Sequence, residues 1–267
     1  MNRIDRCFAE LRARGDKALV CFLTSGDPDF ATTEKLVREI ARSGADIVEL
    51  GVPFSDPLAD GPSIQASSFR ALQAGATVRG VMDSVRSIRT TCETPIVLMT
   101  YFNPVNRYGL ARFAADAAHA GADGVILTDL PPEEAGAWKS AADEAGLATI
   151  FLLAPTSTKE RIEQAAKMGS GFIYCVSRTG VTGARSDMPT ELKALVETIK
   201  SASDLPVVVG FGISKPEHVG FVTQFADGAV VGSALVNVIA DHAGSGDLAR
   251  SAGEFVRSLK DGVTRQE

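Results

Sequence analysis

A glutamate and two aspartates occur close together in the stretch 49–62, where a predicted strand becomes a loop. The strand, 46–51, is short, apolar and β-branched and ends in glycine, as is typical of a buried strand. Alternate side chains of a strand share a face, so Glu49 shares the face of Ile47, and its two neighbours point the other way. If helices or other strands cover both faces, Glu49 is a largely buried acid.

Burial of an unpaired carboxylate raises its pKa, and a carboxyl group that titrates nearer neutrality suits general acid–base catalysis. The loop after the strand adds Asp56 and Asp60. Asp56 is equally well explained as a capping residue in a proline-stiffened turn. No capping role exists for Glu49 inside a strand, so we expect Glu49 to take part in proton transfer.

The composition argues against several classes of protein. The 267-residue chain has a net charge of −6 and no long basic run, so nucleic acid is a poor candidate partner. No apolar stretch reaches the roughly eighteen residues that span a bilayer. The four cysteines are widely spaced and the three histidines lie in polar helical contexts. We therefore expect a cytoplasmic protein with reduced thiols, no metal site and no contact with a membrane.

Short apolar segments alternate with helical patterns along the whole chain. Strands are predicted over residues 17–23, 46–51, 94–101, 122–129, 147–153, 171–177, 205–210 and 227–232. Helices are predicted over residues 3–14, 30–43, 62–74, 77–90, 104–120, 190–201 and 247–260, and two more begin near residues 131 and 157. An Ala-Asp pair recurs in 44–49, 121–126 and 226–231, each time where a helix ends and a strand follows.

Eight strand–helix units without a break in composition predict a single α/β domain over residues 1–267, a (β/α)8 barrel with an extra N-terminal helix. A doubly wound open sheet is the alternative, and the absence of Gly-x-Gly-x-x-Gly after the first strand disfavours it. Active sites of such barrels lie at the carboxyl ends of the strands. One group of strand-end residues is acidic and aromatic: Glu49, Asp60, Tyr101, Asp129 and Tyr174.

A second group of strand-end residues is rich in glycine and hydroxyl groups, at 180–183, 212–214 and 232–233. Loops at these positions of a barrel often bind phosphate through backbone N–H groups, and a helix starting at Ser233 would direct its positive end there. Ser233 alone could be an N-cap, and Gly212 or Gly232 alone a turn former. Together they favour a phosphate site, and Phe22, Met99 and Phe211 could line an apolar part of the substrate.

Six stretches that run in order along the chain carry a resemblance to a known family: 49–65, 99–104, 129–134, 153–157, 177–183 and 210–214. The sequence resembles the tryptophan synthase alpha chains. One departure is Thr128, where proline is expected before Asp129. The resemblance implies a retro-aldol lyase that cleaves indole-3-glycerol phosphate to indole and glyceraldehyde 3-phosphate in tryptophan biosynthesis.

The resemblance also implies roles for individual residues. Glu49 would be the acid–base residue and Asp60 the carboxylate that binds the indole N–H, with Tyr174 near Glu49. Further contacts with the substrate are expected from Phe22, Met99, Tyr101, Asp129, Thr182, Gly183, Phe211, Gly212, Gly232 and Ser233.

A partner is implied as well, a beta chain that carries pyridoxal phosphate, in an α2β2 tetramer. This chain itself would need no cofactor. Asp56 and Arg178 would belong to two closing loops that sense the partner, and the Thr182 hydroxyl would contact Asp56.

Two other classes stay open. One is a different phosphate-binding barrel enzyme, such as a sugar-phosphate epimerase or an aldolase, which would need metal ligands or a catalytic lysine at the strand ends. The other is a barrel subunit that only activates a partner, and the presence of both Glu49 and Asp60 argues against it.

Overall fold

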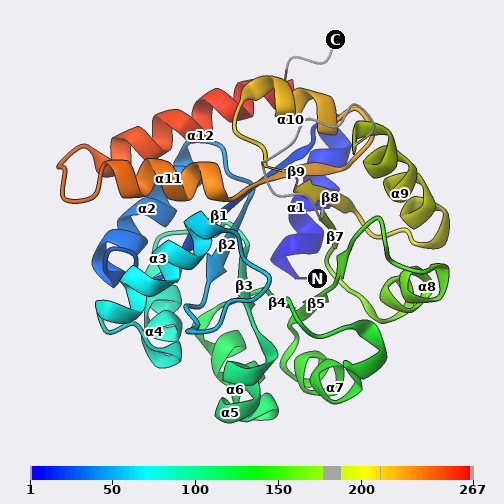
Figure 1. The fold of residues 1–267 in the computed structure, drawn as a ribbon, viewed down its shortest axis with the longest axis horizontal. Helices are drawn as coiled ribbons and strands as arrows, with labels where there is room; N and C mark the ends of the chain where they lie inside the picture. The colour runs from blue at the N-terminus through cyan, green and yellow to red at the C-terminus, as the bar shows by residue number, and fades with distance from the viewer. Residues whose placement is uncertain (1, 177–187, 211, 265–267) are drawn as a thin grey trace.

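The computed structural model describes residues 2–176, 188–210 and 212–264, and its strands form a ring enclosed by helices (Figure 1). The strands are short and almost entirely buried, as expected where helices cover the outside and side chains fill the inside. They are β1 (Ala18–Thr24), β2 (Ile47–Gly51), β3 (Ile96–Thr100), β4 (Gly124–Leu127), β5 (Ala148–Ile150), β6 (Leu152–Leu153), β7 (Ile173–Val176), β8 (Val207–Gly210) and β9 (Gly228–Val231).

All strand pairs are parallel, in the order β5-β4-β3-β2-β1-β9-β8-β7-β6. β5 and β6 are the two halves of one predicted strand, interrupted at Phe151. The first half pairs with β4 and the second with β7, and the Tyr174 N–H donates to the Phe151 carbonyl at 3.0 Å. This strand therefore closes the ring, which confirms the predicted (β/α)8 barrel and excludes an open sheet.

Helices surround the ring on its outer side (Figure 1). In the described part of the chain, no helix is long and apolar enough to cross a membrane. The helices are α1 (Arg3–Arg14), α2 (Phe30–Arg42), α3 (Pro62–Gln73), α4 (Val78–Arg89), α5 (Phe102–Tyr108), α6 (Leu110–Ala120), the 3₁₀ helix η1 (Pro132–Glu134), α7 (Gly136–Ala145), α8 (Lys159–Met168), α9 (Met188–Ala202), α10 (Pro216–Val222), α11 (Ser233–Asp241) and α12 (Leu248–Thr264).

Three helical segments differ from the prediction. The helix predicted over 104–120 is two helices, α5 and α6, which meet at Gly109 with φ +94°. Pro104 does not precede α5 but lies in its first turn, where a missing N–H costs nothing. The helix expected near residue 131 begins as η1 and continues as α7, and α10 was not predicted.

The predicted N-terminal helix, α1, is present and packs against the residues inside the ring. Ile4, Phe8 and Leu11 of α1 belong to the same buried cluster as interior strand residues such as Ile47. The Phe8 ring lies 5.9 Å from that of Phe172, which directly precedes β7. α1 therefore covers the opening of the barrel at the N-terminal ends of the strands.

The recurring Ala-Asp pair has a structural explanation at that same end of the barrel. Each aspartate accepts a backbone N–H at or next to the start of a neighbouring strand: Leu19 to Asp46 at 2.7 Å, Ile96 to Asp123 at 2.8 Å and Val207 to Asp227 at 3.0 Å. Each is also paired with a helix cation: Lys260 at 2.6 Å, Arg89 at 2.5 Å and Lys200 at 3.1 Å respectively. The repeat therefore fixes where the strands begin.

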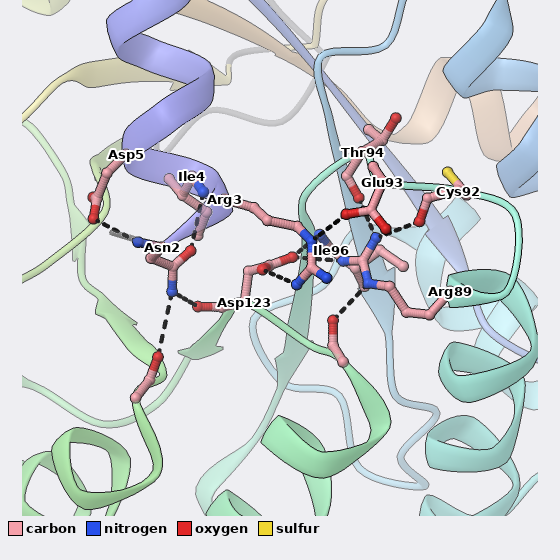
Figure 2. Close-up of polar contacts among 12 residues, drawn as sticks. Asn2, Arg3, Ile4, Asp5, Arg89, Cys92, Glu93, Thr94, Ile96 and Asp123 are labelled. Carbon is pink, nitrogen blue, oxygen red and sulfur yellow. Dashed lines mark hydrogen bonds and ion pairs between the residues drawn. The ribbon is translucent and has the colours of Figure 1, made fainter.

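Figure 2 shows the partners of Asp123, which come from α1, α4 and β3. One carboxylate oxygen accepts from Arg3 of α1 at 3.1 Å and the other from Arg89 of α4, while Asn2 donates to its backbone carbonyl at 2.7 Å. The Asp123 side chain is only 4% exposed. In such barrels the N-terminal face contributes to stability rather than to catalysis, so this network serves to hold α1 in place.

Candidate active site

Glu49 lies in the middle of β2 with its side chain inside the barrel, on the face of Ile47 as the alternation predicts. Its exposed fraction is 0%, and neither carboxyl oxygen has a hydrogen-bond partner among the described residues. Burial raises the pKa of Glu49 to about 8. At pH 7 the group is therefore mainly a neutral acid that holds a transferable proton.

Tyr174 of β7 belongs to the buried cluster inside the ring. Its own burial raises the pKa of Tyr174 well above the ordinary value, and the negative charge of Glu49 raises it further. Tyr174 therefore lies within electrostatic reach of Glu49, although the two come from strands on different sides of β1 in the ring.

A pocket opens at the carboxyl ends of β1 to β4, and neither Glu49 nor Tyr174 is among its lining residues. Phe22 is the register partner of Glu49, and Met99 is the partner of Gly51. A side chain at Gly51 would come within 2.7 Å of the Phe22 ring, so glycine is needed there for the ring to take this position. The lining residues are Phe22, Gly51, Val52, Phe54, Asp60, Ile64, Ser68, Met99, Thr100, Tyr101 and Thr128.

The pocket brings together four residues predicted from the sequence: Phe22, Asp60, Met99 and Tyr101. Sequence reasoning missed several others. Thr128 directly follows β4, so a wider search of strand ends would have found it. Ile64 and Ser68 come from one face of α3, and no sequence pattern indicates that this face lines a pocket.

Asp60 lies in the loop between β2 and α3 and is half-buried. Its N–H donates to the Pro57 carbonyl at 3.1 Å, and its carbonyl accepts from the Gln65 side chain at 2.8 Å. Burial raises the pKa of Asp60 to about 6, and hydrogen bonding with Tyr101 limits the rise. Asp60 is therefore mostly ionised at pH 7, in contrast to Glu49.

Two other predicted residues make different contacts. Asp129 is exposed and accepts the Phe102 N–H at 2.6 Å, which caps the start of α5. Asp56 is exposed, and the Ser55 hydroxyl donates to its carboxylate at 2.6 Å. The remaining predicted residues, Arg178, Thr182, Gly183 and Phe211, lie outside the described residues.

Gly232 is the N-cap of α11 and Ser233 its first residue, so the interpretation of Ser233 as the cap is wrong. Gly232 has no side chain with which to cap this helix start. Among the described residues, the atoms nearest to a Cβ placed on Gly232 are those of Phe22, at 3.9 Å, and Ile64, at 4.0 Å, both in the pocket lining. Gly212, with φ +85°, follows β8 and is exposed. The first N–H groups of α11 therefore lie beside the pocket, next to Phe22 and Ile64.

The fold and the site are those of a (β/α)8-barrel enzyme, with one carboxyl group of raised pKa inside β2 and a second in the loop that follows it. When the surroundings of two carboxyl groups give them different pKa values, the group with the higher pKa can act as an acid, and the other can stay charged. Within the described residues, no group of three or more His, Cys, Asp or Glu side chains could hold a metal ion.

Comparisons with known proteins identify the family. A family model described as tryptophan synthase alpha chain matches residues 8–264. The tryptophan synthase alpha chain of Geobacter sp. (strain M21) is 56% identical over 265 residues, 99% of each chain. That of Caldanaerobacter subterraneus subsp. tengcongensis is 47% identical, over 98% of this chain and 99% of the relative. The crystal structure of tryptophan synthase subunit alpha from Legionella pneumophila str. Paris has a TM-score of 0.91 at 41% identity, over 98% of both chains.

The chain belongs to the tryptophan synthase alpha chain family, as the sequence motifs indicated. It is a lyase of tryptophan biosynthesis, and its activity is the cleavage of indole-3-glycerol phosphate.

Proposed function

We propose that Glu49 and Asp60 divide the acid–base work of this cleavage. Glu49, protonated at neutral pH, donates its proton to the indole ring carbon that carries the glycerol phosphate chain. Positive charge then develops at the ring nitrogen, where the ionised Asp60 accepts a hydrogen bond from the N–H. The single observation that supports this division most strongly is the fully buried Glu49 carboxyl without a hydrogen-bond partner among the described residues.

The second half of the reaction returns the proton. The Glu49 carboxylate removes the proton of the glycerol hydroxyl next to the bond that breaks. The carbon–carbon bond cleaves, its electron pair returns to the ring, and indole and glyceraldehyde 3-phosphate are released. Glu49 ends protonated, as it began. General acid–base groups of this kind contribute about 10²–10⁴ in rate each.

We further propose that the substrate phosphate binds the backbone N–H groups of Gly212, Gly232 and Ser233. The start of α11 supports this, because a helix N-terminus without a side-chain cap offers unpaired donors and a positive dipole end to an anion. Because Gly232 has no side chain, its backbone could approach such an anion closely. The expected contributions of Thr182 and Gly183 remain predictions.

A beta chain with pyridoxal phosphate is the proposed partner, in an α2β2 tetramer, while this single-domain chain acts in the cytoplasm without a cofactor of its own. Leu58 supports a docking surface near the pocket, because this apolar side chain is 94% exposed in the loop that carries Asp60. Closure of this loop through Asp56, and of a second loop through Arg178, stays a prediction.

The test is an assay of indole release from indole-3-glycerol phosphate by the purified chain, alone and mixed with a beta chain. We expect slow release by the chain alone and faster release in the mixture, because closed lids exclude water and complete the site. Absence of indole in both samples would contradict the proposed roles of the two carboxyls. Equal rates in both would contradict activation by the partner.

A further inference from the structure

Tyr101 stands where β3 ends and α5 begins, and it contacts the loop that carries Asp60 at two places. Its ring lies 5.3 Å from the ring of Phe54 near the start of that loop. Its hydroxyl accepts the backbone N–H of Ala59, next to Asp60, at 3.0 Å. One side chain thus touches the loop near both of its ends.

Beyond Val52, which is buried and donates to the Met99 carbonyl at 2.9 Å, the loop has little other anchoring from the described part of the chain. Leu58 and Ala59 are exposed, and the bonds of Leu58 to Asp56 and of Asp60 to Pro57 stay within the loop. The Gln65 side chain binds the carbonyl of Asp60 but leaves the direction of its carboxylate free. Weakly packed loops of this kind open at low free-energy cost, so a single outside contact has a large share in their order.

Tyr101, by contrast, is well fixed. Its side chain is only 5% exposed, and its backbone forms the N-cap of α5. The next residue, Phe102, is held by Asp129 at 2.6 Å. Because the tyrosine hydroxyl accepts from Ala59, its single proton remains for an acceptor on the pocket side, where Asp60 lies.

We propose that Tyr101 is a positioning residue whose hydroxyl fastens the Asp60 loop to the end of β3 and directs the Asp60 carboxylate into the pocket. This inference rests on the proposed role of Asp60. It gives Tyr101 a task other than the substrate contact expected from its place at a strand end.

The electrostatics of Asp60 agree with this arrangement. Burial raises the pKa of Asp60, and hydrogen bonding with Tyr101 lowers it. Loss of the hydroxyl should therefore raise the pKa of Asp60 above about 6, and the low-pH side of the activity profile should move to higher pH.

The experiment compares Tyr101→Phe with Tyr108→Phe in the full chain. The first change keeps the ring against Phe54 and removes only the hydroxyl. The second is a matched control, because the Tyr108 hydroxyl donates to Asp116 at 2.6 Å and lies outside the pocket lining. Hydrogen exchange of residues 52–61 reports on the loop without any substrate. Indole release in the complex with a beta chain, measured against pH, reports on Asp60.

We expect amide exchange in 52–61 to accelerate about tenfold in Tyr101→Phe and to stay unchanged in Tyr108→Phe, as the loss of one hydrogen bond implies. The kcat of Tyr101→Phe should fall about tenfold with a smaller change in KM, and its low-pH limb should shift upward. A substrate contact alone would change KM and leave the exchange of the loop unaltered.

Unchanged exchange in Tyr101→Phe would overturn the inference whatever the activity. Faster exchange with an unaltered kcat and pH profile, in a protein that Asp60→Asn inactivates, would also overturn it. If the wild type releases no indole, the proposed function fails separately. The inference is then tested by the amide exchange of the loop and by the pKa of Asp60, measured by NMR in both tyrosine variants. Both should change in Tyr101→Phe and stay unaltered in Tyr108→Phe.

Discussion

Replacing Glu49 by Gln removes an acid whose pKa burial raises from the ordinary 4.5 to about 8. In the unfolded chain the group loses its proton near pH 4.5, but in the barrel it keeps that proton until about pH 8. Between these values the folded state binds more protons than the unfolded state. The stability of the wild type should therefore fall as the pH rises through this window, while the Gln variant lacks this contribution.

The size of the effect follows from the shift. One proton corresponds to about 1.36 kcal/mol per pH unit, so the whole window is worth about 5 kcal/mol. Between pH 5.5 and pH 7.5, which lie inside the window, the wild type should lose about 2–3 kcal/mol of unfolding free energy relative to Glu49→Gln. Groups common to both proteins cancel in this comparison.

Urea unfolding at the two pH values measures the difference. The fluorescence of Trp138, the single tryptophan of the chain and 1% exposed, reports the transition. Glu144→Gln, a change of an exposed glutamate of α7, controls for the loss of one carboxylate. A difference between wild type and Glu49→Gln that changes by less than about 1 kcal/mol from pH 5.5 to 7.5 would refute the buried neutral acid.

Three further predictions concern the other parts of the site and the fold. Asp60→Asn should lower indole turnover about 10²-fold or more. Wild-type turnover should decrease below about pH 6 as Asp60 gains a proton. A pH profile that is flat from pH 5 to 7 would contradict the role of an ionised Asp60. Asp123→Ala should lower the unfolding free energy by about 3–5 kcal/mol, because it leaves the buried Arg89 without its carboxylate partner. Turnover should be retained, and a loss of activity in the folded variant would contradict this prediction. Gly232→Ala should weaken the binding of glycerol phosphate about tenfold, because the added methyl group lies beside the N–H groups that bind the phosphate. Calorimetry measures the affinity, and an unaltered affinity would contradict a phosphate site at Gly232.

The sequence predicted the barrel because strands buried on both faces are continuous apolar runs, with an amphipathic helix after most of them. It could not predict the division of α5 and α6 at Gly109, because the apolar pattern continues across that residue. α10 has only seven residues, too few for a helical period to stand out. The interruption at Phe151 arises from closure of the ring, which is a property of the whole sheet.

At the site, Glu49 could be predicted because an acid inside an apolar strand is conspicuous. Ile64 and Ser68 could not be predicted, since their place in the pocket lining depends on the tertiary packing of α3. The contact between Tyr101 and Ala59 joins residues 42 positions apart and depends on the path of an irregular loop. Local patterns carry no information on such a path.

The most direct test of the central claim is indole release by Glu49→Gln in complex with a beta chain, measured beside the wild type in a single turnover at pH 7. Binding of glycerol phosphate is measured in the same samples to show that the pocket is intact. Because the proposed mechanism gives Glu49 two proton transfers, we predict that indole formation falls by at least about 10³ while binding changes less than about twofold. Indole formation near the wild-type rate would contradict the account.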